Sequence, residues 1–117
     1  YQSATDKPLS IWKSAYNQRR PYLSLFDLTR ALAFIINNKI KTNTIYNILS
    51  NNYPVKDIVK CIKKINKKTK IKKVDHEIMN QLSYNVSNKK FCSLGFNFKS
   101  KLYKDIKFTL EKLKNIN

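Results

Sequence analysis

The stretch of residues 8–36 most constrains the fold, because four kinds of local structure follow one another within it. Residues 9–13 are rich in strand formers, and 14–18 are polar and typical of a turn. Pro21 disfavours a helical conformation at Arg20, so 21–25 is predicted to be extended. Asp27 is a good helix N-cap, and apolar residues recur at helical spacing after it. The stretch therefore predicts a strand, a turn, an extended segment and a helix.

The rest of the chain predicts a further alternation of strands and helices. In order, the predicted elements are a strand over 44–49, a turn over 50–52, a helix with Pro54 at its first position, a strand over 69–74, a loop over 75–82, an extended piece over 83–86, a short helix that Ser87 caps and Gly95 ends, and a last helix from about residue 100. This order predicts a mixed α/β (α+β) domain of about four short strands and four helices.

Basic residues are in large excess, since 24 lysines and arginines face 7 acidic residues, for a net charge of +17. Such a charge attracts nucleic acid or another anionic surface. The densest run, 60–74, has no aromatic residue for base stacking, since none lies between Tyr53 and Tyr84. Lysine also accompanies abundant Asn and Ile, a bias typical of an AT-rich genome. We therefore interpret most lysines as a solvated face and expect only nonspecific, salt-sensitive binding of nucleic acid.

At 117 residues the chain is one domain or part of one. It has no apolar run of bilayer length and no signal peptide at its start, so no membrane partner is predicted. Cys61 and Cys92 are far apart, and we expect free thiols in a reducing, cytoplasmic environment. Because the sequence does not begin with methionine, we expect a fragment or a processed product.

The order of these features resembles a known family, the extended short-chain dehydrogenases/reductases, which include NAD-dependent nucleotide-sugar epimerases and dehydratases. The second half of such a chain carries a segment like PLTIWGDGSQTRDFIYVDDLVRAL. The matching residues are Pro8, Leu9, Ile11 and Trp12 for its strand, Gln18 and Arg20 for its Gln-x-Arg, Asp27 and Leu28 for its second Asp and helix start, Ile45-Tyr46-Asn47-Ile48 for the family's VYNVG, and Leu94-Gly95-Phe96 for its LGF or LGW. The resemblance covers nearly the whole chain.

The resemblance implies a single substrate-side, C-terminal domain over residues 1–117, without the N-terminal dinucleotide-binding (Rossmann) half. It implies that Arg20 grips the diphosphate of a nucleoside-diphosphate sugar, since a guanidinium can make two parallel bonds to an oxyanion. Ser10 and Trp12 alternate onto one face of the first strand and would lie beside the base. A core position for Trp12 is an equal alternative. The helix after Asp27 would pack against the Rossmann half.

No catalytic residue is predicted in this segment. A glycine-rich dinucleotide loop needs more than the one glycine present, so NAD or NADP is implied only for the full-length enzyme. Tyr103 and Lys107 have Tyr-x-x-x-Lys spacing, but the family's catalytic pair lies upstream of this whole region, and we reject them. His76 is the only histidine, and no metal-ligand spacing surrounds it.

Departures from the family keep three hypotheses open. Family members usually carry a second diphosphate arginine ahead of a Ser-Tyr pair; Ser83 and Tyr84 are kept here, but 76–82 holds no arginine. Lys13 and Phe26 replace the family's glycine and first Asp. The chain is thus the substrate-binding part of an NAD(P)-dependent epimerase or dehydratase, a small basic nucleic-acid-binding module, or a degenerate relative that pairs with a separate nucleotide-binding chain. The predicted strand over 44–49 leaves an edge through which a homodimer could form.

Overall fold

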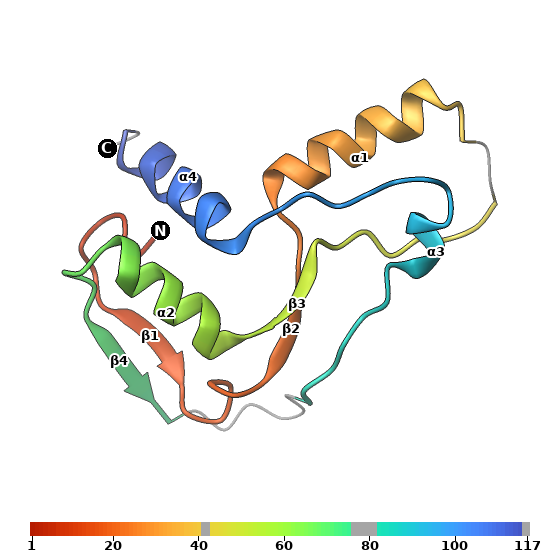
Figure 1. The fold of residues 1–117 in the computed structure, drawn as a ribbon. Coiled ribbons are helices and arrows are strands. Elements are labelled where there is room, and N and C mark those ends of the chain that lie inside the picture. Colours follow the sequence, from red (N-terminus) through yellow and green to blue (C-terminus); the bar gives the residue numbers. More distant parts are fainter. Residues whose placement is uncertain (41–42, 76–81, 116–117) are drawn as a thin grey trace.

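The computed structural model describes residues 1–40, 43–75 and 82–115. The described residues form four strands and four helices, which confirms the mixed α/β class (Figure 1). In chain order these are β1 (Leu9–Trp12), β2 (Arg19–Tyr22), α1 (Leu25–Asn37), β3 (Asn51–Pro54), α2 (Val55–Ile65), β4 (Ile71–Val74), α3 (Lys89–Cys92) and α4 (Leu102–Lys114). Among these helices, none combines the length and the apolar character needed to cross a bilayer.

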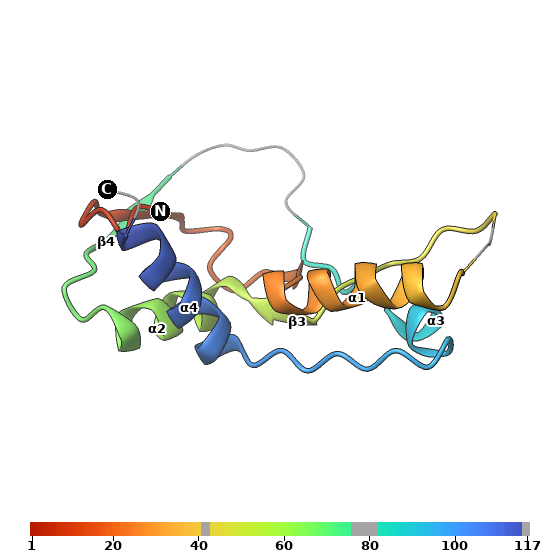
Figure 2. The ribbon, with the colours of Figure 1, turned by 90° about the horizontal axis from the view of Figure 1, so that it is seen from above.

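The strands form two separate two-stranded sheets. β1 pairs in parallel with β4, with Leu9 opposite Ile71, and β2 pairs antiparallel with β3, with Arg20 opposite Tyr53. Seen from above, β1, β4, α2 and α4 gather at one end of an elongated molecule, and α1 and α3 lie at the other (Figure 2). The sheet of β2 and β3 lies between these two ends (Figure 1).

An aromatic core stabilises the end that holds α1 and α3. Phe91 of α3 is fully buried, and the rings of Phe34, Tyr46, Phe96 and Phe98 have their centroids within 6.2 Å of its own. Edge-on and tilted packing of this kind adds to the burial of apolar area. Because these rings come from α1, α3 and the segments around them, the core ties together parts of the chain that are far apart in sequence.

The prediction that Asp27 caps α1 is wrong. Ser24 is the N-cap, its hydroxyl accepts a hydrogen bond from the Asp27 N–H at 3.0 Å, and the helix begins at Leu25. Asp27 is instead the third residue of the helix and is completely buried. The local signal for a helix start is therefore correct, but it belongs to the serine three residues earlier, as in half of a capping box.

The strand predicted over 44–49 is also wrong, because its described residues have no regular secondary structure. The strand lies a few residues later, in β3, in place of the predicted turn. Pro54 ends β3 and is the N-cap of α2 rather than its first residue. Leu49 is buried whereas Ile45 is 87% exposed, so the apolar run follows the surface of the aromatic core instead of pairing as a strand.

The predicted short helix is present as α3, but its N-cap is Asn88 rather than Ser87, and it ends at Cys92 with Ser93 as its C-cap, before Gly95. Gly95 follows the short helix α3 with a φ of +96°, a left-handed conformation that glycine adopts without steric cost. Asn38 is the C-cap of α1. The last helix ends at Lys114.

Candidate functional site

Arg20 is half-buried on β2, and its guanidinium is held by neutral groups. Nη1 donates to the carbonyl oxygens of Leu82 (2.6 Å) and Arg19 (2.9 Å), and Nη2 donates to Oε1 of Gln18 (2.6 Å). The ring of Tyr84 lies 5.1 Å from the guanidinium carbon, within range of a cation–π interaction. The two polar residues of the Gln-x-Arg motif thus contact each other directly.

The charge of Arg20 meets no carboxylate in the part of the chain that the structure describes. The ion pairs there join Lys13 to Asp75, Arg30 to Asp27 and Lys107 to Glu111. Of the five N–H donors of a guanidinium, the bonds of Arg20 to described residues engage three. An oriented cation without an acidic partner is the arrangement that suits an anionic ligand.

Arg19, its neighbour on β2, is held differently. Its Nε donates to Oδ1 of Asn85 and its Nη2 to the carbonyl oxygen of Asn52, both at 2.8 Å. Arg19 also uses its backbone, because its N–H donates to the hydroxyl of Ser83 and its carbonyl accepts from the Tyr84 N–H. Arg19 therefore fastens the segment after residue 82 to β2.

Side-chain amides continue this attachment along the segment of residues 82–88. The amide of Asn52 accepts from the N–H of Val86 and donates to its carbonyl, both at 2.9 Å, which imitates the bonds between paired strands. Asn88 donates to the carbonyl of Leu49 at 2.8 Å. The segment predicted to be extended over 83–86 thus lies beside the β2–β3 sheet without being a strand.

Asn47, which matches the asparagine of the family's VYNVG segment, donates to the carbonyl of Ser87 at 3.4 Å. Asn47 therefore also helps to hold the segment of residues 82–88 in place.

Ser10 and Trp12 lie on β1, in the other sheet from Arg20. Both side chains are exposed, Trp12 to 36%, whereas Ile11 between them is buried at 6%. Trp12 is therefore not a core residue of the described chain, and the alternation of Ser10 and Trp12 onto one face is confirmed. A turn over 13–17 leads from Trp12 to β2, so the structure places the two groups on adjacent strands along the chain but not in one sheet.

Tyr22 shares a face of β2 with Arg20, two residues away. Burial raises the pKa of the Tyr22 phenol, and the positive charge of Arg20 partly opposes this rise. The phenol therefore stays neutral next to the guanidinium at physiological pH, so it leaves the positive charge of this face intact.

Asp27 organises a buried polar cluster that the sequence analysis missed. Its Oδ1 accepts from Arg30 Nη1 and from the Lys99 N–H, both at 3.0 Å. Its Oδ2 accepts from the Ser50 hydroxyl at 2.8 Å and from the Ser100 N–H at 3.0 Å. Four donors from three segments converge on one carboxylate, which joins α1 to the start of β3 and to the chain before α4. Helical spacing marks position 27 as a helix start but carries no sign of these distant partners.

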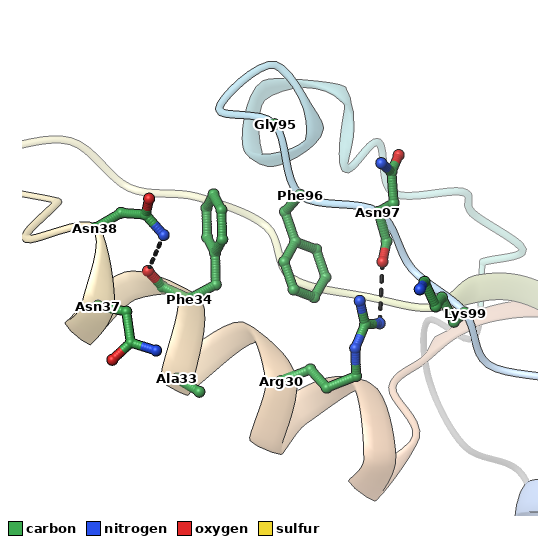
Figure 3. Close-up of a pocket in the computed structure, with 9 residues that line it drawn as sticks. All are labelled: Arg30, Ala33, Phe34, Asn37, Asn38, Gly95, Phe96, Asn97 and Lys99. Atoms are coloured by element: carbon green, nitrogen blue, oxygen red, sulfur yellow. Dashed lines mark hydrogen bonds between the residues drawn. The ribbon is translucent and has the colours of Figure 1, made fainter.

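A hollow of about 420 Å³ lies between the second half of α1 and residues 95–99 (Figure 3). The rings of Phe34 and Phe96, which line it, lie side by side in edge contact with their centroids 5.3 Å apart, and Arg30 donates to the carbonyl of Asn97 at 3.0 Å. The guanidinium carbon of Arg30 also lies 5.0 Å from the ring of Phe96. None of Arg20, Ser10 and Trp12 lines this hollow, so it is separate from the predicted site.

The residues rejected as catalytic lie in ordinary surroundings. Lys107 pairs with Glu111 at 3.8 Å on α4, and the ring of Tyr103 faces Lys64 of α2. Cys61 and Cys92 are free thiols, as predicted, and burial raises the pKa of the Cys61 thiol against the opposing charge of Lys64. The described residues contain no group of three potential metal ligands. His76 and most of the arginine-free stretch 76–82 lie outside the described residues, so the structure does not test the predictions made for them.

Comparison with known proteins identifies the fold. No family model matches the sequence, and no curated protein sequence matches it. Solved structures do match: UDP-glucose 4-epimerase from Thermus thermophilus in complex with NAD has a TM-score of 0.79 at 14% identity, over 99% of this chain and 38% of the epimerase chain. UDP-glucose 4-epimerase from Thermotoga maritima with UDP-glucose has a TM-score of 0.76 at 19% identity, over 98% of this chain and 37% of the epimerase chain.

The dTDP-glucose 4,6-dehydratase from Bacillus anthracis in complex with NAD is equally similar, with a TM-score of 0.76 at 18% identity, over 99% of this chain and 37% of the dehydratase. The resemblance seen in the sequence is therefore confirmed at the level of fold: the chain has the fold of part of an extended short-chain dehydrogenase/reductase. It spans less than two fifths of the length of these structures.

Proposed function

We propose that this chain is the C-terminal, substrate-side part of an NAD(P)-dependent nucleotide-sugar epimerase or dehydratase. In this proposal Arg20 binds the diphosphate of a nucleoside-diphosphate sugar, and Ser10 and Trp12 lie beside its base. The segment alone does not catalyse. The similarity in fold to enzymes whose names specify UDP-glucose and dTDP-glucose supports the substrate class.

The observation that carries the proposal is the state of Arg20. Three neutral acceptors orient its guanidinium, and no acidic residue of the described chain neutralises it. Arg19 is also held by neutral acceptors, but only Arg20 matches the Gln-x-Arg motif, with Gln18 on one side of its guanidinium and the ring of Tyr84 on the other. A guanidinium that is already oriented loses little conformational freedom when it binds a phosphate, so more of the interaction energy contributes to affinity.

The outer face of α1 supports the expectation of a larger enzyme. Leu25, Leu32 and Ile36 are 60%, 50% and 72% exposed and recur at helical spacing, whereas Ala31 on the opposite face is fully buried. The chain also spans less than two fifths of its structural neighbours. We infer that the N-terminal Rossmann half of the same chain covers this outer face.

The described residues do not fit a dinucleotide of their own. The only glycine, Gly95, lies in the turn after the four-residue helix α3 and has no neighbouring glycine with which to cradle a pyrophosphate. NAD or NADP is therefore assigned to the Rossmann half, and no step of the reaction is assigned to this chain. The part left to this segment is to bind and orient the nucleotide.

Calorimetric titration of the 117-residue chain with nucleotides tests the proposal. We expect UDP, dTDP or GDP to bind, and the matching nucleoside to bind at least about tenfold more weakly, because it lacks the groups that Arg20 recognises. Trp12 is the only tryptophan, so its fluorescence should change in the same titration if the base lies beside it. Equal affinity for a nucleotide and its nucleoside would contradict the role of Arg20.

The exposure of the outer face of α1 leads to a separate prediction about stability. Replacing Leu32 and Ile36 together by glutamine should leave the free energy of unfolding of the 117-residue chain within about 1 kcal/mol, because exposed positions contribute little. The single change Ala31→Gln, on the buried face of the same helix, should destabilise strongly. Chemical denaturation of both variants beside the unmodified chain measures the two effects. A large loss for the outer pair would show that this face is already packed within the chain.

A further inference from the structure

The lysine run gathers at the end of the molecule away from the aromatic core, on the last turns of α2, the connection after it and β4 (Figure 1). We call this surface the lysine face. Its members are Lys60, Lys63, Lys64, Lys67, Lys68, Lys70, Lys72 and Lys73, all exposed. No acidic residue occurs between Asp57 and Asp75, and none of the ion pairs between described residues involves the face. Its charge is therefore not compensated from within the described chain.

Folding supplies the aromatic residues that the run lacks in sequence. The ring of Tyr103, from α4, lies 5.6 Å from Nζ of Lys64, and the ring of Tyr16, from the turn after β1, lies 5.4 Å from Nζ of Lys73. Tyr103 is 43% exposed. Each pair places an aromatic ring beside a lysine, and rings beside cations are the combination that binds single-stranded nucleic acid, through its phosphates and by stacking of its bases.

The surface is poorly suited to a lipid bilayer. Residues 60–74 include no exposed large apolar side chain, so this stretch offers nothing that would insert below the lipid head groups. The positive charge of the lysine face instead complements the phosphates along a nucleic-acid strand.

We propose that the lysine face, with Tyr103 and Tyr16 beside it, binds single-stranded nucleic acid without sequence preference. This activity is distinct from the proposed nucleotide-sugar binding, because it uses neither Arg20 nor Ser10 nor Trp12. Phosphate contacts supply most of the affinity, so binding is strongly salt-dependent.

Fluorescence anisotropy with a labelled oligo(dT) of about 20 nucleotides, longer than a typical single-strand binding site, tests the proposal across a salt series. One variant of the 117-residue chain replaces Lys63, Lys64, Lys67 and Lys68 by glutamine. A control variant removes the same charge at exposed positions at the other end of the molecule, by glutamine at Lys39, Lys89, Lys90 and Lys99. We expect the first set to reduce the slope of log affinity against log salt by about 2 to 3, at ~0.7 for each lost contact with a single strand, and the control to change it by less than about 1.

A third variant, Tyr103→Leu, should weaken oligo(dT) binding at least about fivefold while leaving the salt slope unchanged, because it removes stacking but no charge. Bound oligo(dT) should also protect the lysines of its binding site from chemical acetylation. This measurement on the unmodified protein locates the binding site independently of any variant. Equal effects of the two charge variants, or protection spread evenly over both sets, would overturn the proposal in favour of attraction by net charge alone. Preference for a duplex of equal length would overturn it too.

Discussion

Replacing Asp27 by asparagine should lower the free energy of unfolding by about 3 kcal/mol, because it removes the charge partner of the half-buried Arg30 and leaves part-buried N–H donors facing an amide. Asp27 accepts four hydrogen bonds, and no part of its surface is exposed. Asparagine has nearly the same shape, but its amide would point two N–H groups at donors such as the Ser100 N–H. Urea denaturation followed by circular dichroism measures the loss.

Asp75→Asn is the matched control for this prediction. Asp75 also pairs with a basic side chain, Lys13, at 2.7 Å, but both side chains are more than half exposed. Surface pairs of this kind contribute little, so the control should change stability by no more than about 1 kcal/mol. Similar small effects for both substitutions would mean that water or rearrangement satisfies the partners of Asp27, and that the cluster does not hold α1 to the rest of the chain.

Arg20→Lys should weaken the binding of UDP, or of whichever nucleotide binds in the titration above, by about 10- to 100-fold. Lysine keeps the positive charge but cannot make two parallel hydrogen bonds to a phosphate, and charge-assisted bonds of this kind contribute about 1.5–3 kcal/mol each. Isothermal titration at one salt concentration measures the change.

Arg19→Lys serves as the control, since Arg19 is the next residue on the same strand and its guanidinium is used by Asn85 and Asn52. The two variants have the same net charge, so any general attraction of the basic chain for phosphate is identical in both. A loss of affinity only at Arg20 supports its proposed role. Equal affinities for the two variants would assign nucleotide binding to net charge or to another site.

The elements that depend on local sequence are predicted well. β1, β2, α2, β4 and α4 lie close to their predicted positions because strand formers, proline and helical periodicity act within a few residues. The left-handed conformation of Gly95 after the short helix is predicted for the same reason. The order of these elements suffices for the fold class.

The predictions are wrong where contacts with residues far away in the sequence determine the secondary structure or the burial of a side chain. β3 forms over Asn51–Pro54 because the backbone of β2 provides partners there, whereas the more apolar run before it packs on the aromatic core. Asp27 is buried because Lys99 and Ser100, more than 70 residues later, bring N–H donors to it. Neither partner is visible in a local pattern.

The candidate site is predicted in part. Strand alternation predicts that Ser10 and Trp12 share one face of β1, but it leaves the exposure of Trp12 open, and the contact between Gln18 and Arg20 is not predicted. The separation of Ser10 and Trp12 from Arg20 into two sheets is not predicted either, because pairing between strands depends on the whole fold. Binding of a nucleotide by these residues stays a prediction.

A titration of the ¹⁵N-labelled 117-residue chain with UDP, followed by ¹H–¹⁵N correlation NMR, tests the central claim most directly. The account predicts saturable shifts in the signals of Ser10, the Trp12 indole and Arg20, with smaller changes at Tyr84, whose ring lies against the Arg20 guanidinium. Shifts confined to the lysine face, or an unchanged spectrum at millimolar UDP, would contradict the assignment of this chain as a nucleotide-binding segment.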